Sequence, residues 1–221
     1  RSNEIVGVST ERGSIIGRTS LPKGQVIKSV KEYKGKAIIT VQDVSSLMEK
    51  PVGASLKLVS FKSNELVDFY VSESHDITTP LFKDQVLYIR ESNGQLKAID
   101  TQTDEIIWEQ AMEGWHAYPL IEANGSIVVV DGNSAVGELS LKAFDMLSGE
   151  LIWQKESEGQ PLYPIVNTEQ QLFVVQRKSK LEAISSENGT LQWHFETRRI
   201  YTHPVLYGNK LVLSTKHEEE G

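Results

Sequence analysis

Five histidines are the side chains best suited to hold a metal ion or to move a proton near neutral pH. They stand at positions 75, 116, 194, 203 and 217. No two of them form a His-x-His or His-x-x-x-His pair, the spacings that place two imidazoles on one side of a strand or helix. The chain also contains no cysteine, so thiolate ligands and thiolate nucleophiles are excluded. The sequence therefore predicts no metal site.

Serine nucleophiles and phosphate-binding loops have their own sequence patterns, and neither pattern is present. No Gly-x-Ser-x-Gly elbow occurs. The segment 131–137 contains Gly132 and Gly137, but their spacing is wrong for a phosphate loop and no lysine follows them. We predict no catalytic residues, no cofactor-binding residues and no bound cofactor, and therefore a protein that is not an enzyme.

Four segments that each precede a proline are rich in aromatic, histidine and arginine side chains. Such side chains are enriched at protein contacts because they combine large area with directional hydrogen bonds. The residues that we predict to bind a partner are His75, Asp76, Trp115, His116, Tyr118, Tyr163, Arg198, Arg199, Tyr201 and His203. In the alternative interpretation, the tyrosines fill a central channel while the histidines and arginines bind nearby carbonyls.

A second basic group, Arg177-Lys178-Ser179-Lys180, lies apart from these segments in the sequence. The chain has 23 basic and 30 acidic residues and a net charge of −7, so this group reverses the local charge. Two interpretations stay open: a site that attracts an acidic partner, or a solvated turn.

The elements that must position these residues follow from an internal repeat. Its tryptophans stand at 108, 153 and 193, and its alanines stand at 98, 143 and 183, both separated by 45 and 40 residues. Prolines at 80, 119, 164 and 204 keep nearly the same spacing. A weaker copy begins at Leu56, with Asp68 at the tryptophan position. The repeat period of about 40 residues is typical of a propeller blade.

Each period contains four short apolar runs separated by turn signals. In one period they cover 80–82, 86–89, 96–100 and 105–109, with Ser92-Asn93-Gly94 and Thr103-Asp104 between them. A helical repeat would need apolar residues at i, i+3 and i+4, which Gly, Asn and β-branched residues interrupt. We predict an all-β protein, a β-propeller of four-stranded antiparallel blades, present as a partial set of a six- to eight-bladed propeller.

The motif Ala98-x-Asp100 with Trp108, the motif Ala143-x-Asp145 with Gly149 and Trp153, and Ala183 with Gly189 and Trp193 resemble the pyrroloquinoline-quinone-like propeller repeat. The resemblance implies that each tryptophan docks against the neighbouring blade. Quinoprotein alcohol dehydrogenases of this superfamily hold their cofactor with a cysteine pair and calcium, and this chain has no cysteine. The resemblance points instead to a noncatalytic branch similar to the propeller lipoproteins of outer-membrane-protein assembly.

We expect a single propeller domain or fragment over residues 1–221. Its predicted blades are 1–27 (partial), 28–74 (degenerate), 75–114, 115–159, 160–199 and 200–221 (partial). We also expect the two ends, at Glu4–Val8 and Lys210–Ser214, to supply the same part of a repeat.

The predicted function is a noncatalytic scaffold that binds a protein or a cell-envelope polymer outside the cytoplasm. Its negative charge argues against nucleic acid or anionic lipid as a partner, and its apolar runs are too short to insert into a membrane. The alternatives are a fragment of a quinone-dependent dehydrogenase and an extracytoplasmic ligand-sensing domain of a membrane-anchored signalling protein.

Overall fold

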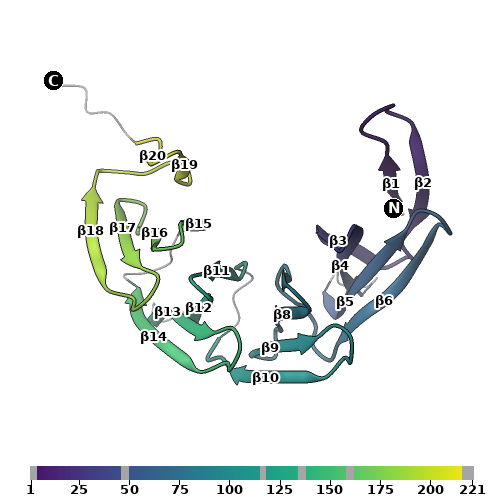
Figure 1. Cartoon of the computed structure of the whole chain (residues 1–221), viewed down its shortest axis with the longest axis horizontal. Helices are drawn as coiled ribbons and strands as arrows, with labels where there is room; N and C mark the ends of the chain where they lie inside the picture. The colour runs from purple at the N-terminus through teal and green to yellow at the C-terminus, as the bar shows by residue number, and fades with distance from the viewer. Residues whose placement is uncertain (1–3, 46–49, 115–117, 134–137, 158–161, 216–221) are drawn as a thin grey trace.

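The described part of the molecule is an open arc of antiparallel β-sheets (Figure 1). The computed structural model describes residues 4–45, 50–114, 118–133, 138–157 and 162–215. Four of the sheets have four strands and two have two strands. No helix long and apolar enough to cross a bilayer occurs in these ranges. The predicted all-β class and the partial propeller of four-stranded antiparallel blades are confirmed.

We name the four-stranded sheets as blades in chain order. Blade I contains β3 (Gln25–Tyr33), β4 (Lys36–Val44), β5 (Pro51–Ser60) and β6 (Glu65–Ser72). Blade II contains β7 (Leu81–Lys83), β8 (Val86–Arg90), β9 (Gln95–Asp100) and β10 (Ile106–Ala111). Blade III contains β11 (Ile121–Ala123), β12 (Ser126–Asn133), β13 (Glu138–Asp145) and β14 (Leu151–Ser157). Blade IV contains β15 (Leu162–Asn167), β16 (Gln171–Gln176), β17 (Lys180–Ser185) and β18 (Leu191–Glu196).

Two hairpins flank the blades. The N-terminal hairpin is β1 (Glu4–Val8) with β2 (Ile15–Ser20), and the C-terminal hairpin is β19 (Val205–Tyr207) with β20 (Lys210–Val212). In each blade every strand pairs with the next one along the chain. The first strands, such as β11 and β15, lie toward the inside of the arc, and the fourth strands β6, β10, β14 and β18 lie on its outside (Figure 1).

The aspartate of the repeat motif shapes the turn between the third and fourth strands. Asp100 accepts hydrogen bonds from the amides of Gln102 at 2.7 Å and Thr103 at 3.2 Å. Asp145 does the same one blade later, with the amides of Leu147 at 2.9 Å and Ser148 at 2.8 Å. These side chains satisfy backbone donors that the turn leaves unpaired, so their role is structural.

The tryptophan of one blade docks on the same turn of the next blade, as the repeat predicts. Trp108 is 8% exposed and its indole nitrogen donates to the main-chain oxygen of Met146 at 3.0 Å. Gly149 has φ +74°, and a Cβ built there would lie 2.6 Å from the Trp108 ring. Only glycine combines this backbone conformation with so close an approach.

The same contact recurs between blades III and IV. Trp153 is 6% exposed and donates to the main-chain oxygen of Ser186 at 2.9 Å. Gly189 has φ +72°, and a Cβ built there would lie only 2.7 Å from the Trp153 indole. The predicted docking is therefore confirmed at both junctions.

Trp193 differs from the other two repeat tryptophans, and the expectation that it is buried is wrong. It is 41% exposed, although its ring lies 5.9 Å from that of Phe173. Its neighbour along the arc is the C-terminal hairpin, which has no third or fourth strand among the described residues. Among residues 4–215 as described, no turn between a third and a fourth strand covers this indole.

At the N-terminal hairpin the aromatic residue lies in the turn and the glycines lie in the strands, the reverse of the other two junctions. Gly7 of β1 and Gly17 of β2 face Phe61, which lies in the turn between β5 and β6. A Cβ on Gly7 would lie 3.0 Å from the Phe61 ring, and one on Gly17 would lie 2.6 Å from its main-chain oxygen. Here the aromatic ring comes from the turn, and the strands supply the glycines.

At the other junctions, the turn between the third and fourth strands of a blade contacts the tryptophan on the fourth strand of the preceding blade. Because β1 and β2 contact this turn of blade I, they take the places of the third and fourth strands of a preceding blade. The C-terminal hairpin follows the fourth strand β18 along the chain and takes the places of first and second strands. The expectation that the two ends supply the same part of a repeat is therefore wrong.

Candidate binding face

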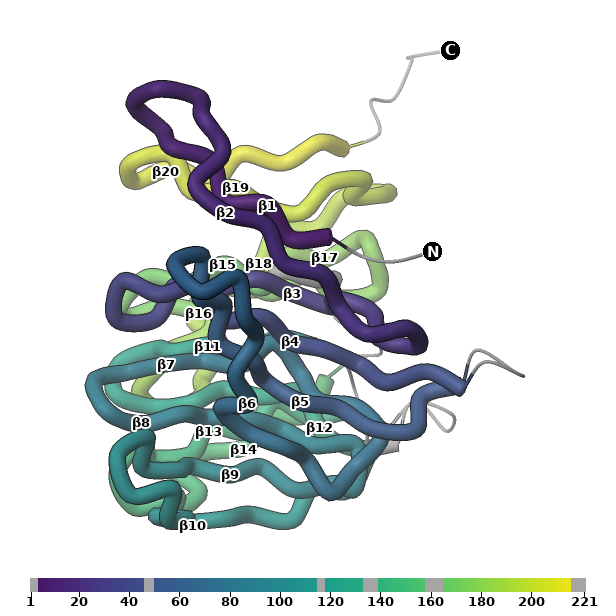
Figure 2. Tube along the Cα trace, turned by 90° about the vertical axis from the view of Figure 1, so that its right-hand side faces the viewer, coloured from purple at the N-terminus to yellow at the C-terminus, as the bar shows by residue number. Residues whose placement is uncertain are grey.

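Strands in equivalent positions of successive blades are aligned across the arc, so the strand ends form two opposite faces (Figure 2). One face, which we call the loop face, carries the connections between blades and the turns between second and third strands. Backbone hydrogen bonds join these two kinds of segment, from Met112 to Gly94 at 2.7 Å and from Thr197 to Ser179 at 2.9 Å. Its described segments are the connections 73–80, 112–114, 118–120 and 197–204 and the turn residues 45, 50, 91–94 and 177–179.

Asp131, near the end of β12, is a buried anchor for this face. Its side chain is fully buried, and its carboxylate accepts hydrogen bonds from Arg90 and Lys142, each at 2.9 Å. The amides of Glu113 and Gly114 donate to the same carboxylate at 3.0 and 3.3 Å. Arg90, itself buried, also donates to the main-chain oxygen of Gly114. The start of the connection between blades II and III is therefore fixed to this buried carboxylate.

Glu91 has the equivalent place in blade II, one blade earlier. Its side chain is fully buried, forms an ion pair with Lys97 at 2.6 Å and accepts a hydrogen bond from Tyr70 at 2.8 Å. Ser72, the last residue of β6, also donates to it. The amide of Asp76 binds the side chain of the adjacent Ser92 at 3.0 Å. Glu91 thus holds the end of β6, and the Ser72 hydroxyl in turn accepts a hydrogen bond from the amide of Ser74 at 3.0 Å, at the start of the connection 73–80.

In blade IV an uncharged amide stands at the same position. Gln176 is 1% exposed and accepts a hydrogen bond from Ser157, the last residue of β14, at 2.8 Å. Each of three successive blades therefore uses a buried acceptor at the end of its second strand to hold the chain that enters it. This arrangement gives the loop face a fixed base.

These contacts lower the pKa of both buried carboxyls. For Asp131, burial alone raises the pKa, but the hydrogen bonds from Lys142 and Glu113 and the charges of Lys142 and Arg90 outweigh it. For Glu91, burial likewise raises the pKa, and hydrogen bonds from Lys97, Ser72 and Tyr70 reverse the effect. Both groups are carboxylates at neutral pH.

A lowered pKa makes the stability of the fold depend on acid pH. The stabilisation is complete above the pKa of the unfolded chain, about 4, and is lost as the pH falls through the lower pKa of the folded protein. We expect the free energy of unfolding, measured by urea titration, to fall between pH 5 and pH 3. This loss should be smaller in Glu91→Gln than in the parent protein, while the exposed control Glu109→Gln should behave as the parent. An equal acid loss in all three proteins would contradict this role of Glu91.

The described predicted binding residues lie on the loop face. His75 is exposed, and Asp76 is mostly buried with its carboxylate 3.8 Å from Lys28. Tyr118 is half-buried and packs against the apolar cluster between blades III and IV. Trp115 and His116 lie outside the described residues, as does the side chain of Tyr163 on β15.

The remaining predicted residues lie on the connection between blade IV and the C-terminal hairpin. Arg198, Arg199 and His203 are exposed. The guanidinium of Arg199 lies 5.2 Å from the centre of the Tyr201 ring, and Tyr201 is 54% exposed. This is a cation–π contact at the surface of the protein.

The structure brings the two basic segments of the sequence together. The amide of Ile200 donates to the main-chain oxygen of Lys178 at 2.6 Å, and Thr197 donates to Ser179 at 2.9 Å. We call Arg177, Lys178, Arg198 and Arg199 the basic cluster; all four are exposed. The sequence presents the two halves as separate groups, because nothing in it shows that these turns are paired.

The buried network of Arg90, Asp131 and Lys142 was missed at the sequence level. Its signal is a charged residue inside or just after an apolar strand, in the same register in two repeats: Glu91 with Lys97, and Asp131 with Lys142. Across the described ranges, no three His, Asp or Glu side chains come together as a metal ion would require.

The blades, the docked tryptophans and the face of connections define a β-propeller of tryptophan-docking repeats. The chain belongs to the family of the outer membrane protein assembly factor BamB, whose family model matches residues 1–162 and 137–218. Among curated proteins none matches the chain.

Solved structures with the same fold include BamB from Moraxella catarrhalis, with a TM-score of 0.59 and 15% identity over 96% of this chain and 64% of that one. This chain therefore spans under two thirds of the length of that structure. The quinohemoprotein alcohol dehydrogenase ADHIIG from Pseudomonas putida HK5 has a TM-score of 0.51 and 12% identity, over 83% of this chain and 37% of that one. The computationally designed Ika4 protein gives 0.50 and 16%, over 72% and 91%.

Proposed function

We propose that this chain is a noncatalytic scaffold that binds a protein partner through its loop face, outside the cytoplasm in the cell envelope. Membership of the BamB family supports a protein-binding propeller and an envelope location. The observation that carries the proposal is the hydrogen-bonded base of the loop face, where the buried acceptors Glu91, Asp131 and Gln176 bind the chain that enters three successive blades.

The basic cluster supports an acidic segment as the part of the partner that is bound. Four exposed basic residues lie on two segments that backbone hydrogen bonds join, on a chain whose net charge is −7. Opposite charge at the rim of an interface increases the rate of association and favours the correct partner. The exposed Tyr201 beside Arg199 adds an aromatic contact, the type of residue that dominates binding energy at many interfaces.

We expect Arg199→Ala and Tyr201→Ala each to weaken capture of an envelope protein by at least about tenfold, because each removes a side chain that is exposed and needed for no described core contact. The measurement is quantitative affinity purification from an envelope extract, followed by titration with the purified partner. Arg12→Ala and Lys62→Ala, which remove exposed cations from turns on the opposite face, are the matched controls. Equal capture by all four variants would rule out the loop face as the binding surface.

A further inference from the structure

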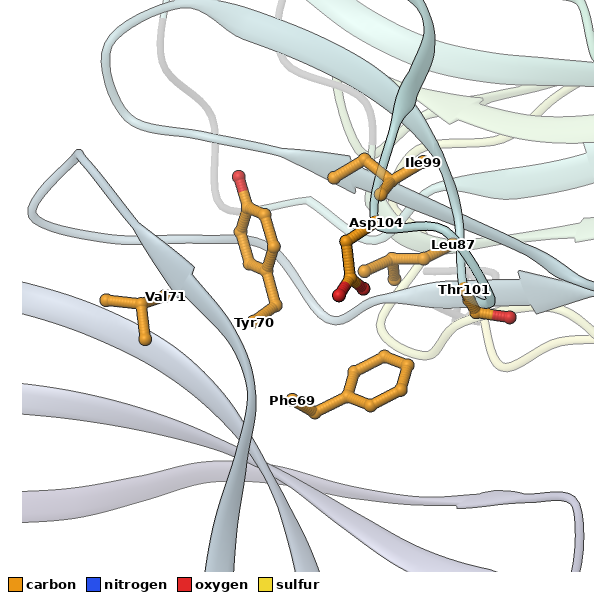
Figure 3. Close-up of a pocket in the computed structure, with 7 residues that line it drawn as sticks. All are labelled: Phe69, Tyr70, Val71, Leu87, Ile99, Thr101 and Asp104. Carbon is orange, nitrogen blue, oxygen red and sulfur yellow. The ribbon is translucent and has the colours of Figure 1, made fainter.

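A cavity of about 210 Å³ lies between blade I and blade II (Figure 3). One wall belongs to blade II and is formed by Leu87, Ile99, Thr101 and Asp104. The rings of Phe69 and Tyr70, both from β6, stand on the other side. The cavity is smaller than the roughly 300–1,000 Å³ of pockets that hold drug-sized ligands, so its size suits a single side chain.

The wall on blade II has a filled counterpart on blade III. Leu87 pairs with Ile99 across β8 and β9, as Ile127 pairs with Phe144 across β12 and β13. On blade III these two residues lie in the same buried apolar cluster as Trp108. The third wall position, Thr101, corresponds to Met146, whose main-chain oxygen accepts the hydrogen bond of the Trp108 indole. The fourth, Asp104, corresponds to Gly149, which lies under the Trp108 ring.

Blade IV repeats the filled arrangement. Leu172 and Ile184 pair across β16 and β17 and pack in the same cluster as Trp153. Ser186 accepts the hydrogen bond from this indole, and Gly189 lies under it. The four-residue wall is thus a tryptophan-binding surface, and two of its three copies hold a tryptophan of the preceding blade.

The wall on blade II holds no tryptophan, because blade I lacks one at this position. Asp68 stands at its sequence position and pairs with Lys57 instead. The aromatic ring that follows, Phe69, packs against Phe82 and Tyr33, with ring centres 6.0 and 5.8 Å apart. These rings belong to the same apolar cluster as Leu87 and Ile99, which are 1% and 5% exposed, and the Tyr33 hydroxyl also bonds to that of Thr101 at 2.6 Å. The cavity is the space that they leave beside Asp104, where blade I supplies no indole.

Asp104 changes the chemistry of the wall on blade II. It has φ +60°, close to the +74° and +72° of Gly149 and Gly189, so the backbone of the turn is the same. At the filled junctions the indole excludes any Cβ. At the junction between blades I and II a carboxylate lines the cavity, which favours a ligand that donates hydrogen bonds and disfavours an acidic one.

We propose that this cavity binds the tryptophan side chain of a partner protein, carried on a segment with neutral or basic neighbours. The cavity opens beside the turn 101–104, at the opposite ends of the strands from the loop face. It is a second binding site and does not depend on the function proposed for the loop face. The main-chain oxygen of Thr101 occupies the place of the oxygens of Met146 and Ser186, which accept indole N–H groups at 3.0 and 2.9 Å.

The test uses ¹⁵N-labelled protein titrated with N-acetyl-tryptophanamide and followed by amide NMR. We expect saturable shifts at Leu87, Ile99 and the turn 101–104, with N-acetyl-leucinamide binding at least about tenfold more weakly. Ile99→Phe introduces the residue that blade III has at this position, so it should fold, fill the cavity and abolish the shifts. Thr101→Met introduces the residue found at the corresponding position of blade III, Met146, and is a second filling variant should the first fail to give a folded spectrum.

Titration with probes of opposite charge provides an independent test of the role of Asp104. Tryptamine, a cation, should bind more tightly than the anion N-acetyl-tryptophan, and Asp104→Asn should reduce this difference. The proposal is overturned by an absence of shifts at these residues, by unchanged binding in the filled variants, or by equal binding of the two charged probes. A dimer in sedimentation that the probe dissociates would also overturn it, because the occupant would then be a second copy of this chain.

Discussion

Trp153→Ala is expected to lower the free energy of unfolding by about 3 to 5 kcal/mol, the range for removing a large buried aromatic side chain. Trp153 is 6% exposed, contacts the blade IV wall and donates to the oxygen of Ser186 at 2.9 Å. Its removal opens a cavity between two blades and leaves that oxygen without its indole donor. The measurement is the urea midpoint and slope at pH 7, with circular dichroism and tryptophan fluorescence compared.

Trp193→Ala is the matched control, because the same residue type stands in the same register of the next blade. It is 41% exposed, so less apolar area leaves water there on folding. We expect a markedly smaller loss of stability than for Trp153→Ala. Equal losses for the two variants would show that burial between blades is not what makes the repeat tryptophan important.

The repeat could be predicted from sequence because its markers are local and regular. Within blade II, the four predicted strands agree with β7 to β10 to within two residues at each end. The tryptophan, the turn glycine on which it docks and the aspartate that binds that turn all belong to one pattern of about 40 residues. Local periodicity therefore determined the blade, and the docking of Trp108 and Trp153 followed from it.

What could not be predicted depends on which segments meet across the arc. The fate of Trp193 depends on strands that lie beyond its own repeat. The contact of Phe61 with Gly7 and Gly17 joins residues more than forty positions apart, and it reverses the usual direction of docking. At the candidate site, the exposed Arg199 and Tyr201 could be named from composition alone, but their union with Arg177 and Lys178 rests on backbone pairing that the sequence does not display.

The buried charges of the loop face were missed for a related reason. Lys97 and Lys142 resemble ordinary solvated positions of a strand, because a lysine in an amphipathic strand usually faces water. In the folded protein each is only 11% exposed and pairs with a carboxylate at the end of the neighbouring strand. Periodicity identifies which residues share a face of a strand, but it does not show whether a loop covers the end of that face.

Asp131→Ala is the other substitution with a large expected effect, again about 3 to 5 kcal/mol. Removing one partner of a buried ion pair leaves the other charge without compensation, and this cost commonly exceeds the net contribution of the intact pair. Arg90 is 1% exposed and would keep its charge, since a guanidinium does not deprotonate in proteins. The amides of Glu113 and Gly114 would lose their acceptor as well.

The double variant Arg90→Met with Asp131→Leu separates the cost of an uncompensated Arg90 charge from the loss of the acceptor for the Glu113 and Gly114 amides. It removes both charges of the Arg90–Asp131 pair and keeps apolar volume, while Lys142 retains Glu113 as a partner at 3.3 Å. We therefore expect it to be more stable than Asp131→Ala alone. Both variants should still release the connection at 112–114, because both lack the carboxylate that holds it. Hydrogen exchange of the Glu113 and Gly114 amides should therefore accelerate in both, and the exposed control Glu109→Ala should leave it unchanged. Protected amides in the double variant would show that Asp131 stabilises the blades without anchoring the loop face.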